Sequence, residues 1–383
     1  MSALKYWLWL ATRSGIGIVR AKELIEHFGS PENIFLAKHA DYLEIGNLKS
    51  ADIMQLMNKE LDEASRIQSS CAEAGVQVIS LHDSNYPERL RNIYDPPLVL
   101  YIKGNFPFID DECVVGVVGS RTCTPYGIST AENVGYELAQ NNIIVATGLA
   151  RGIDTAAVRG ALRGGYHVVG VIGTGVDIVF PAENKDVFND VIAAGAIVSE
   201  YPPGTPAHKQ HFPARNRIIS GLSLGVAVIE APKKSGALIT ASRALEQNRD
   251  VFALPGNVDA LACQGSNALL REGAIPFMTA QDIICEYKSS FPSKISTENS
   301  PNTKKSFDNK PKVDYIDLGT ILEKLDGDEK VIVESIGRNS VNVDDIILNT
   351  GFPAQKVLAS LTILELGEYV CRDNKGNWEI KIV

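Results

Sequence analysis

The chain has 383 residues, of which 45% are hydrophobic and 22% are charged, and its formal net charge at pH 7 is −9. This length favours two or three domains, and this composition is typical of globular proteins, which excludes a disordered or fibrous chain. The apolar stretch near the start is too short to span a bilayer and lacks a following cleavage site, so we expect a cytoplasmic protein without membrane insertion.

The cysteines, histidines and glycines give no sign of a metal or cofactor. The six cysteines show no C-x-x-C spacing, which argues against a zinc knuckle or a disulfide framework. His208 and His211 have no third ligand nearby. Gly173 and Gly175 lack the third glycine of a dinucleotide fingerprint, and the chain contains no P-loop motif. We therefore expect neither metal nor cofactor.

Residues 1–75 have the pattern of short helices. The break Ser14-Gly15-Ile16-Gly17 is typical of a helix-hairpin-helix (SAM-like) domain, whose glycine amides can contact a DNA phosphate. However, residues 1–75 carry eight Lys/Arg and ten Asp/Glu. A structural helical bundle therefore remains as good an interpretation as a DNA contact.

Residues 76–287 alternate between strand and helix patterns, after an extension at 76–105. This alternation predicts a Rossmann-like, doubly wound parallel sheet, an α/β fold. The predicted strands are 113–118, 143–147, 167–172, 196–200, 225–231 and 251–254. The predicted helices between them are 126–141, 155–163, 184–194, 218–222 and 237–248.

Small and basic residues follow several of the predicted strands. They are Gly119 to Thr122, Gly148 to Asp154 with Asp154 as a helix N-cap, Gly173 to Gly175, and Lys233 to Gly236. Because ligands bind outside the carboxyl ends of such strands, these loops predict one phosphate-binding rim.

Residues 204–249 are locally basic, with seven Lys/Arg against two Glu, in an acidic chain. Arg215 and Arg217 bracket Asn216 just before the helix predicted at 218–222, which would aim two guanidinium groups at phosphates. Lys233 and Lys234 precede a helix start that favours an anion. The alternative is a basic surface that only keeps the domain soluble.

The C-terminal part begins with a Ser/Asn/Lys/Pro-rich stretch at 288–312, which predicts a flexible linker. Residues 313–383 then show helices near 316–325, 328–337, 342–349 and 353–366 and a hairpin at 368–372 and 377–382, turned at 374–376. This pattern predicts a winged helix. It carries seven Lys/Arg and thirteen Asp/Glu, so we expect it to bind a protein or pack on its own chain.

The motifs of the central region resemble the DNA-processing protein A (DprA/Smf) family. They are VGSR (118–121), TGLARGIDTAA (147–157), GTGVDIVFPAEN (173–184), SEYPPG (199–204), FPARNRIISGLS (212–223), VIEAPKKSGALITASRALEQNRDVFALPG (228–256) and QGSNALLREGA (264–274). The resemblance covers the central domain almost continuously, and extends more loosely to the terminal domains.

This resemblance implies a homodimer that binds single-stranded DNA, protects it, and loads the RecA recombinase on it during natural transformation and recombination. It also implies help in displacing the single-strand-binding protein. The family usually has a histidine where this chain has Val158, so its role cannot be carried over. The implied strand contacts are Ser120, Arg121, Arg151, Phe212, Arg215, Asn216, Arg217, Lys234, Ser235 and Gly236.

Two other function classes compete with this interpretation. One is a phosphoribohydrolase of the cytokinin-activating LOG family, which has a PGGxGT loop followed by catalytic acids. Here the equivalent stretch, 232–240, has two lysines and no carboxylate, so we expect no enzyme. The other is a nucleotide-sensing Rossmann module, which needs only the same rim and a small ligand.

Overall fold

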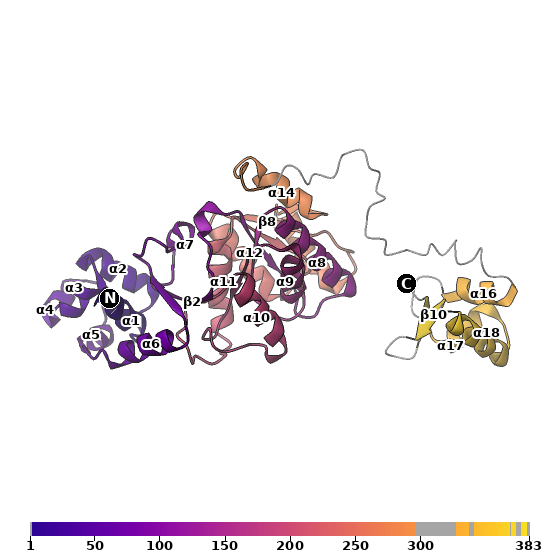
Figure 1. The fold of residues 1–383 in the computed structure, drawn as a ribbon, viewed down its shortest axis with the longest axis horizontal. Helices are drawn as coiled ribbons and strands as arrows, with labels where there is room; N and C mark the ends of the chain where they lie inside the picture. The colour runs from indigo at the N-terminus through magenta and orange to yellow at the C-terminus, as the bar shows by residue number, and fades with distance from the viewer. Residues whose placement is uncertain (1, 296–326, 337–340, 368, 373–376, 381–383) are drawn as a thin grey trace. The chain divides into compact units, whose positions relative to one another are not determined.

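The chain divides into two units, Met1–Asn299 and Ser300–Val383 (Figure 1). The computed structural model describes residues 2–295, 327–336, 341–367, 369–372 and 377–380. None of the helices in these ranges is both long and apolar enough to cross a membrane.

The first unit begins with six helices, the first of which is buried among the other five. Trp7, Leu8, Trp9 and Leu10 are all buried, and the Trp9 indole donates to the carbonyl of Asn58 at 2.9 Å. Such a helix, apolar on every side, must be surrounded by others. The helices are α1 (Ser2–Ala11), α2 (Ile18–Phe28), α3 (Pro31–Leu36), α4 (His39–Leu43), α5 (Ser50–Met57) and α6 (Asp62–Glu73).

A nine-stranded sheet in the order β1-β2-β6-β5-β4-β3-β7-β8-β9 follows these helices. The first two strands pair antiparallel and the strands from β3 to β9 are parallel, which confirms the predicted doubly wound fold. The strands are β1 (Gln77–Ser80), β2 (Val99–Gly104), β3 (Val114–Val118), β4 (Ile144–Thr147), β5 (Val168–Val171), β6 (Ala196–Ser199), β7 (Gly225–Val228), β8 (Asp250–Ala253) and β9 (Ile275–Pro276).

The helices between the strands pack in pairs, α8 on α9 and α11 on α12. The first pair is close because Gly135 faces the carbonyl of Ala157 and Gly160 faces that of Glu132. The helices are α7 (Glu88–Arg91), α8 (Pro125–Gln140), α9 (Ile153–Gly164), α10 (Lys185–Ala194), α11 (His211–Leu222), α12 (Gly236–Glu246), α13 (Gln264–Arg271) and α14 (Ala280–Lys288).

Two local predictions in this region were wrong. Helix α11 begins at His211 rather than at residue 218, so Arg215 and Arg217 lie within the helix instead of before it. Helix α9 begins at Ile153 with Gly152 as its N-cap, so Asp154 is not the cap. Instead, its carboxylate accepts the N–H groups of Gly148 and Ala150, in the loop before the helix.

The second unit has the element order of a winged helix: α16 (Gly327–Ile336), α17 (Val343–Thr350), α18 (Ala354–Leu366), β10 (Val370–Arg372) and β11 (Trp378–Ile380). Val341 forms an isolated antiparallel bridge with Trp378, and Trp378 packs in a core with Ile332, Ile346 and Leu361. Residues 296–312 of the predicted linker, the predicted helix 316–325 and the predicted turn 374–376 lie outside the described residues.

Candidate nucleic-acid-binding cleft

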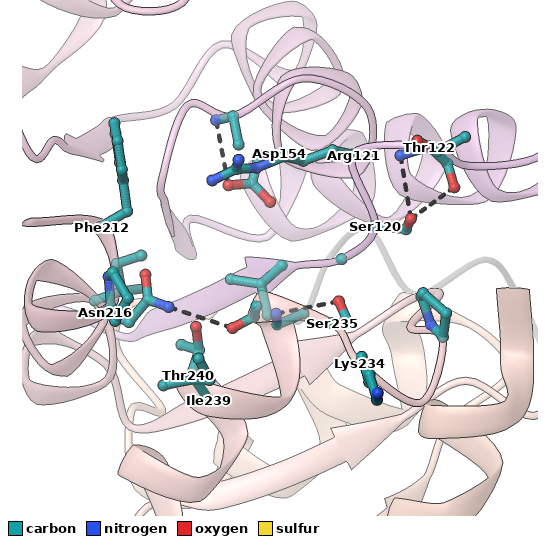
Figure 2. A pocket seen from close by; sticks show the side chains of 18 of the residues that line it. Ser120, Arg121, Thr122, Asp154, Phe212, Asn216, Lys234, Ser235, Ile239 and Thr240 are labelled. Atoms are coloured by element: carbon teal, nitrogen blue, oxygen red, sulfur yellow. Dashed lines mark hydrogen bonds between the residues drawn. The ribbon is translucent and has the colours of Figure 1, made fainter. Parts of the chain in front are cut away.

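A cleft of about 850 Å³ opens where the strand order of the sheet reverses, between β3 and β7. Ligand sites of doubly wound sheets lie at this point because the loops from the two adjacent strands diverge there. The cleft is lined by the loops after β3, β4 and β7 and by α11 and α12 (Figure 2). In this view the loop carrying Arg121 lies on one side, and Lys234 and Ser235 lie on the other.

The loop after β3 is held in place so that Arg121 remains exposed. The buried Ser120 hydroxyl accepts from the N–H of Thr122 at 3.1 Å and donates to the Thr122 carbonyl at 2.6 Å. Gly152 (φ 76°) lets the next loop pass against the carbonyl of Ser120, where any side chain would collide. Among the described residues, Arg121 has no ion-pair partner.

The loop after β7 presents the start of α12 to the cleft. Ser235 is the N-cap, and its hydroxyl accepts from the N–H of Ala237 at 3.2 Å. The Asn216 amide donates to the Gly236 carbonyl at 3.3 Å and so ties α11 to this loop. Lys234 is exposed, and none of the ion pairs in the described part of the chain includes it.

The start of α8 and the loop before α9 already bind carboxylates of the protein. The buried Glu230 carboxylate accepts from the N–H and hydroxyl of Thr124, at 2.9 and 2.6 Å, at the start of α8. Asp154 accepts from the N–H groups of Gly148 and Ala150, in the loop before α9. A helix start favours a negative charge, and the start of α12, where Gly236 is exposed, lines the cleft.

Arg215 is among the residues that line the cleft, but it is buried, with 4% of its surface exposed. Its guanidinium donates to the carbonyls of Gly148, at 2.7 Å, and Val171, so it joins two strand ends. Burial lowers the pKa of Arg215 to about 10, although the nearby Asp154 carboxylate opposes this shift. Its Nε has no hydrogen-bond partner among the residues that the structure describes.

Arg217 points away from the cleft, because two residues along a helix turn a side chain through more than half a circle. It is 3% exposed, lies 2.5 Å from Glu200 and 3.2 Å from Asp95, and is not part of the cleft lining. Burial lowers its pKa, but Glu200 and Asp95 outweigh burial and the pKa of Arg217 is raised. We expected the guanidinium groups of Arg215 and Arg217 both to face phosphates. That of Arg217 instead pairs with carboxylates of the protein.

Arg151 also lies outside the cleft lining. It is exposed and forms an ion pair with the exposed Glu183. Hydrogen bonding from Arg151 holds the pKa of Glu183 below its ordinary value. An exposed pair of this kind is weak, so the guanidinium could exchange Glu183 for another anion.

The aromatic Phe212 closes one end of the cleft and is half-buried (Figure 2). Its ring lies 5.2 Å from that of Phe180 and 5.7 Å from the Arg121 guanidinium carbon. Phe180 and Lys209 also line the cleft and were not among the predicted site residues. Lys209 lies in the basic window and Phe180 lies in the motif at 173–184, so both could have been found from the sequence.

The glycine break between α1 and α2 lies beside an ion pair of the protein. A side chain on Gly15 would lie 3.9 Å from Asp52, which pairs with Arg20 at 2.7 Å. The Arg20 guanidinium also donates to the Gly15 carbonyl, at 3.5 Å, so this cation is engaged within the protein, which favours the structural interpretation of the hairpin.

The central region matches a known protein family. The family model for DNA recombination-mediator protein A matches residues 77–288. The DNA processing protein DprA of Streptococcus pneumoniae is 44% identical over 209 residues, which are 55% of this chain and 73% of that protein. The chain belongs to the DprA/Smf family. The DprA of Bacillus subtilis is 36% identical over 239 residues, 62% of this chain and 80% of that protein.

Solved structures and the C-terminal unit agree with this membership of the DprA/Smf family. The Streptococcus pneumoniae DprA structure has a TM-score of 0.65 at 35% identity, covering 74% of this chain and 97% of that one. A Helicobacter pylori DprA structure, described for its single-stranded DNA binding mode, has a TM-score of 0.51 at 28% identity, with coverages of 56% and 96%. The DprA winged helix model matches residues 320–374.

Proposed function

We propose that the cleft binds single-stranded DNA, with phosphates at the start of α12 and near Arg121 and Lys234, and with a base against Phe212. The observation that carries this proposal is that unpaired cations and an accessible aromatic ring line one open cleft. Stacking on an aromatic side chain requires an unpaired base, which a single strand offers and a duplex does not. The Helicobacter pylori relative, whose structure concerns single-stranded DNA binding, supports the proposal.

The wider role that we propose follows from membership of the DprA/Smf family. The chain protects incoming single strands in the cytoplasm and loads the RecA recombinase on them during natural transformation and recombination. It acts as a homodimer and helps to displace the single-strand-binding protein. Of the strand contacts expected from the sequence, Ser120, Arg121, Phe212, Asn216, Lys234, Ser235 and Gly236 are the ones that we propose touch DNA directly, with Arg215 supporting the strand ends.

Binding rather than catalysis is the role that this cleft supports. Asp154 is the carboxylate among the cleft-lining residues of the described chain, and two backbone N–H groups and Arg215 engage it. A ribohydrolase needs a carboxylate free to stabilise a developing positive charge. We therefore propose that the protein is not an enzyme.

The test is fluorescence anisotropy of the full chain with a labelled poly-dT strand and with the matching duplex, over a salt series. We expect tight, salt-sensitive binding of the strand and weak binding of the duplex, with AMP and ADP unable to compete at millimolar concentration. Nucleotide competition at micromolar concentration would favour the nucleotide-sensing module instead. Equal affinity for strand and duplex would refute the stacking part of the proposal.

The homodimer part has its own test. Two clefts that hold one strand raise the affinity only for strands long enough to reach both. We therefore expect affinity to rise steeply above a threshold oligonucleotide length. An affinity that does not change with length, or a monomer at micromolar concentration in sedimentation, would refute the shared strand while leaving the single cleft intact.

A further inference from the structure

The helix α18 of the winged-helix unit exposes an uncharged face. Val357, Leu361 and Leu364 are buried on its inner side. On its outer side, two neighbouring rows at i, i+4 spacing are exposed: Ala354, Leu358 and Thr362, and Gln355, Ala359 and Ile363, together termed the α18 face. Leu358 is 48% and Ile363 is 56% exposed. Helices that are apolar on both sides are normally covered by a partner.

The chemistry of the α18 face does not suit DNA. In the helix-turn-helix pair α17 and α18, the second helix is the one that enters a major groove in DNA-reading proteins. Such a helix reads bases and phosphates with Arg, Lys, Asn or Gln, and the α18 face offers only Gln355. The cation of α18, Lys356, is paired with Asp328 at 2.8 Å and lies 4.5 Å from the centre of the Phe352 ring.

The acidic charges of the winged-helix unit indicate what covers the α18 face. Asp344 and Asp345 lie in the first turn of α17, one turn before Leu348, which is 79% exposed. Glu365 is exposed near the end of α18. Residues 313–383 carry thirteen Asp/Glu and seven Lys/Arg, so a second copy would bring two acidic borders together, whereas a basic partner would be attracted.

We propose that the α18 face docks a partner protein, which presents a row of apolar side chains bordered by lysine and arginine. Apolar contact at the centre with a charged rim is the usual composition of a transient interface. The winged helix of this chain thereby recruits a protein rather than reading DNA. This inference concerns the C-terminal unit and does not depend on what the cleft binds.

The experiment uses the full chain and a fluorescent helical peptide of leucine and lysine with all leucines on one side. A peptide of the same composition in shuffled order, which keeps the charge but has no apolar side, is the control. We expect the amphipathic peptide to bind at least about tenfold more tightly than the shuffled one. Leu358→Ser with Ile363→Ser should abolish this preference and leave the melting temperature unchanged, since both side chains are exposed.

The matched control variant is Leu36→Ser with Leu43→Ser, which removes leucines of 65% and 62% exposure from the N-terminal helices and should not affect peptide binding. Equal binding of both peptides, or an unchanged preference in the Leu358/Ile363 variant, would overturn the proposal. If the wild type self-associates, the Leu358/Ile363 variant does not, and the peptide does not compete with self-association, the α18 face binds a second copy of the chain. A loss of duplex or single-strand affinity in that variant would assign it to nucleic acid.

Discussion

The helix α11 and the loop before α12 carry the two halves of one basic window, and they use their charge in opposite ways. In α11, Arg215 and Arg217 are 4% and 3% exposed and are engaged by carbonyls and carboxylates. In the loop, Lys233 and Lys234 are exposed. The window therefore presents fewer positive charges to a ligand than its residue count suggests, because a cation that is already paired attracts phosphate less strongly.

The difference has a structural cause. A loop at the carboxyl end of a parallel strand opens into solvent, whereas a helix packed on the sheet directs most of its side chains into the protein. An arginine buried in this way needs partners, and Arg217 finds them in Glu200 and Asp95. Substitutions in the two halves should therefore change different properties.

The largest effect is expected from Arg217→Ala. This change removes a buried guanidinium together with its hydrogen bonds to the partly exposed Glu200 and Asp95, and should lower the free energy of unfolding by about 3 kcal/mol. Urea unfolding measures it, and the exposed Arg159→Ala is the matched control, expected within about 0.5 kcal/mol of the wild type. If Arg217→Ala kept full stability but lost DNA affinity, the assignment of Arg217 to the interior would be wrong.

A smaller loss of stability is expected from Gly148→Ala. The new methyl group would lie 2.6 Å from the Arg215 guanidinium and would displace it, at a cost of about 1–3 kcal/mol. Gly236→Ala, at the start of α12, has no atom within 4 Å and should be as stable as the wild type. Thermal unfolding compares the two. Equal melting temperatures would show that Arg215 is not fixed at the strand ends.

Phe212→Leu tests the aromatic end of the cleft without changing any charge. We expect poly-dT to bind about tenfold more weakly, through the loss of stacking. The slope of log affinity against log salt should not change, since no phosphate contact is lost. A variant with wild-type affinity would make Phe212 a packing residue for Phe180 only.

The smallest effect, and the sharpest comparison, is expected from Lys234→Ala against Lys233→Ala. Both lysines are exposed, but only Lys234 lines the cleft. Losing one phosphate contact should reduce the magnitude of the salt slope by about 0.7 and weaken poly-dT binding a few-fold. Lys233→Ala should leave the slope unchanged. Equal slopes for both variants would mean that general charge, and not the cleft, attracts the strand.

The sequence by itself determined most of the order of strands and helices, because short β-branched apolar runs such as 225–231 favour buried parallel strands. It also determined which small and basic residues follow each strand, and the winged-helix pattern of the C-terminal unit. The convergence of these loops was predictable for the same reason: the carboxyl ends of parallel strands share one edge of the sheet, whereas phosphate binding at that edge stays a prediction.

The tertiary structure decided which of those residues remain available to a ligand. Arg217 bonds to Asp95, 122 positions away, and Glu230 bonds to Thr124, 106 positions away. No local pattern records such pairs, since they depend on how distant segments pack. Charge and motif therefore indicated which loops to consider, but packing left Arg121 and Lys234 without an ion pair among the described residues and buried Arg215 and Arg217 among partners of the protein.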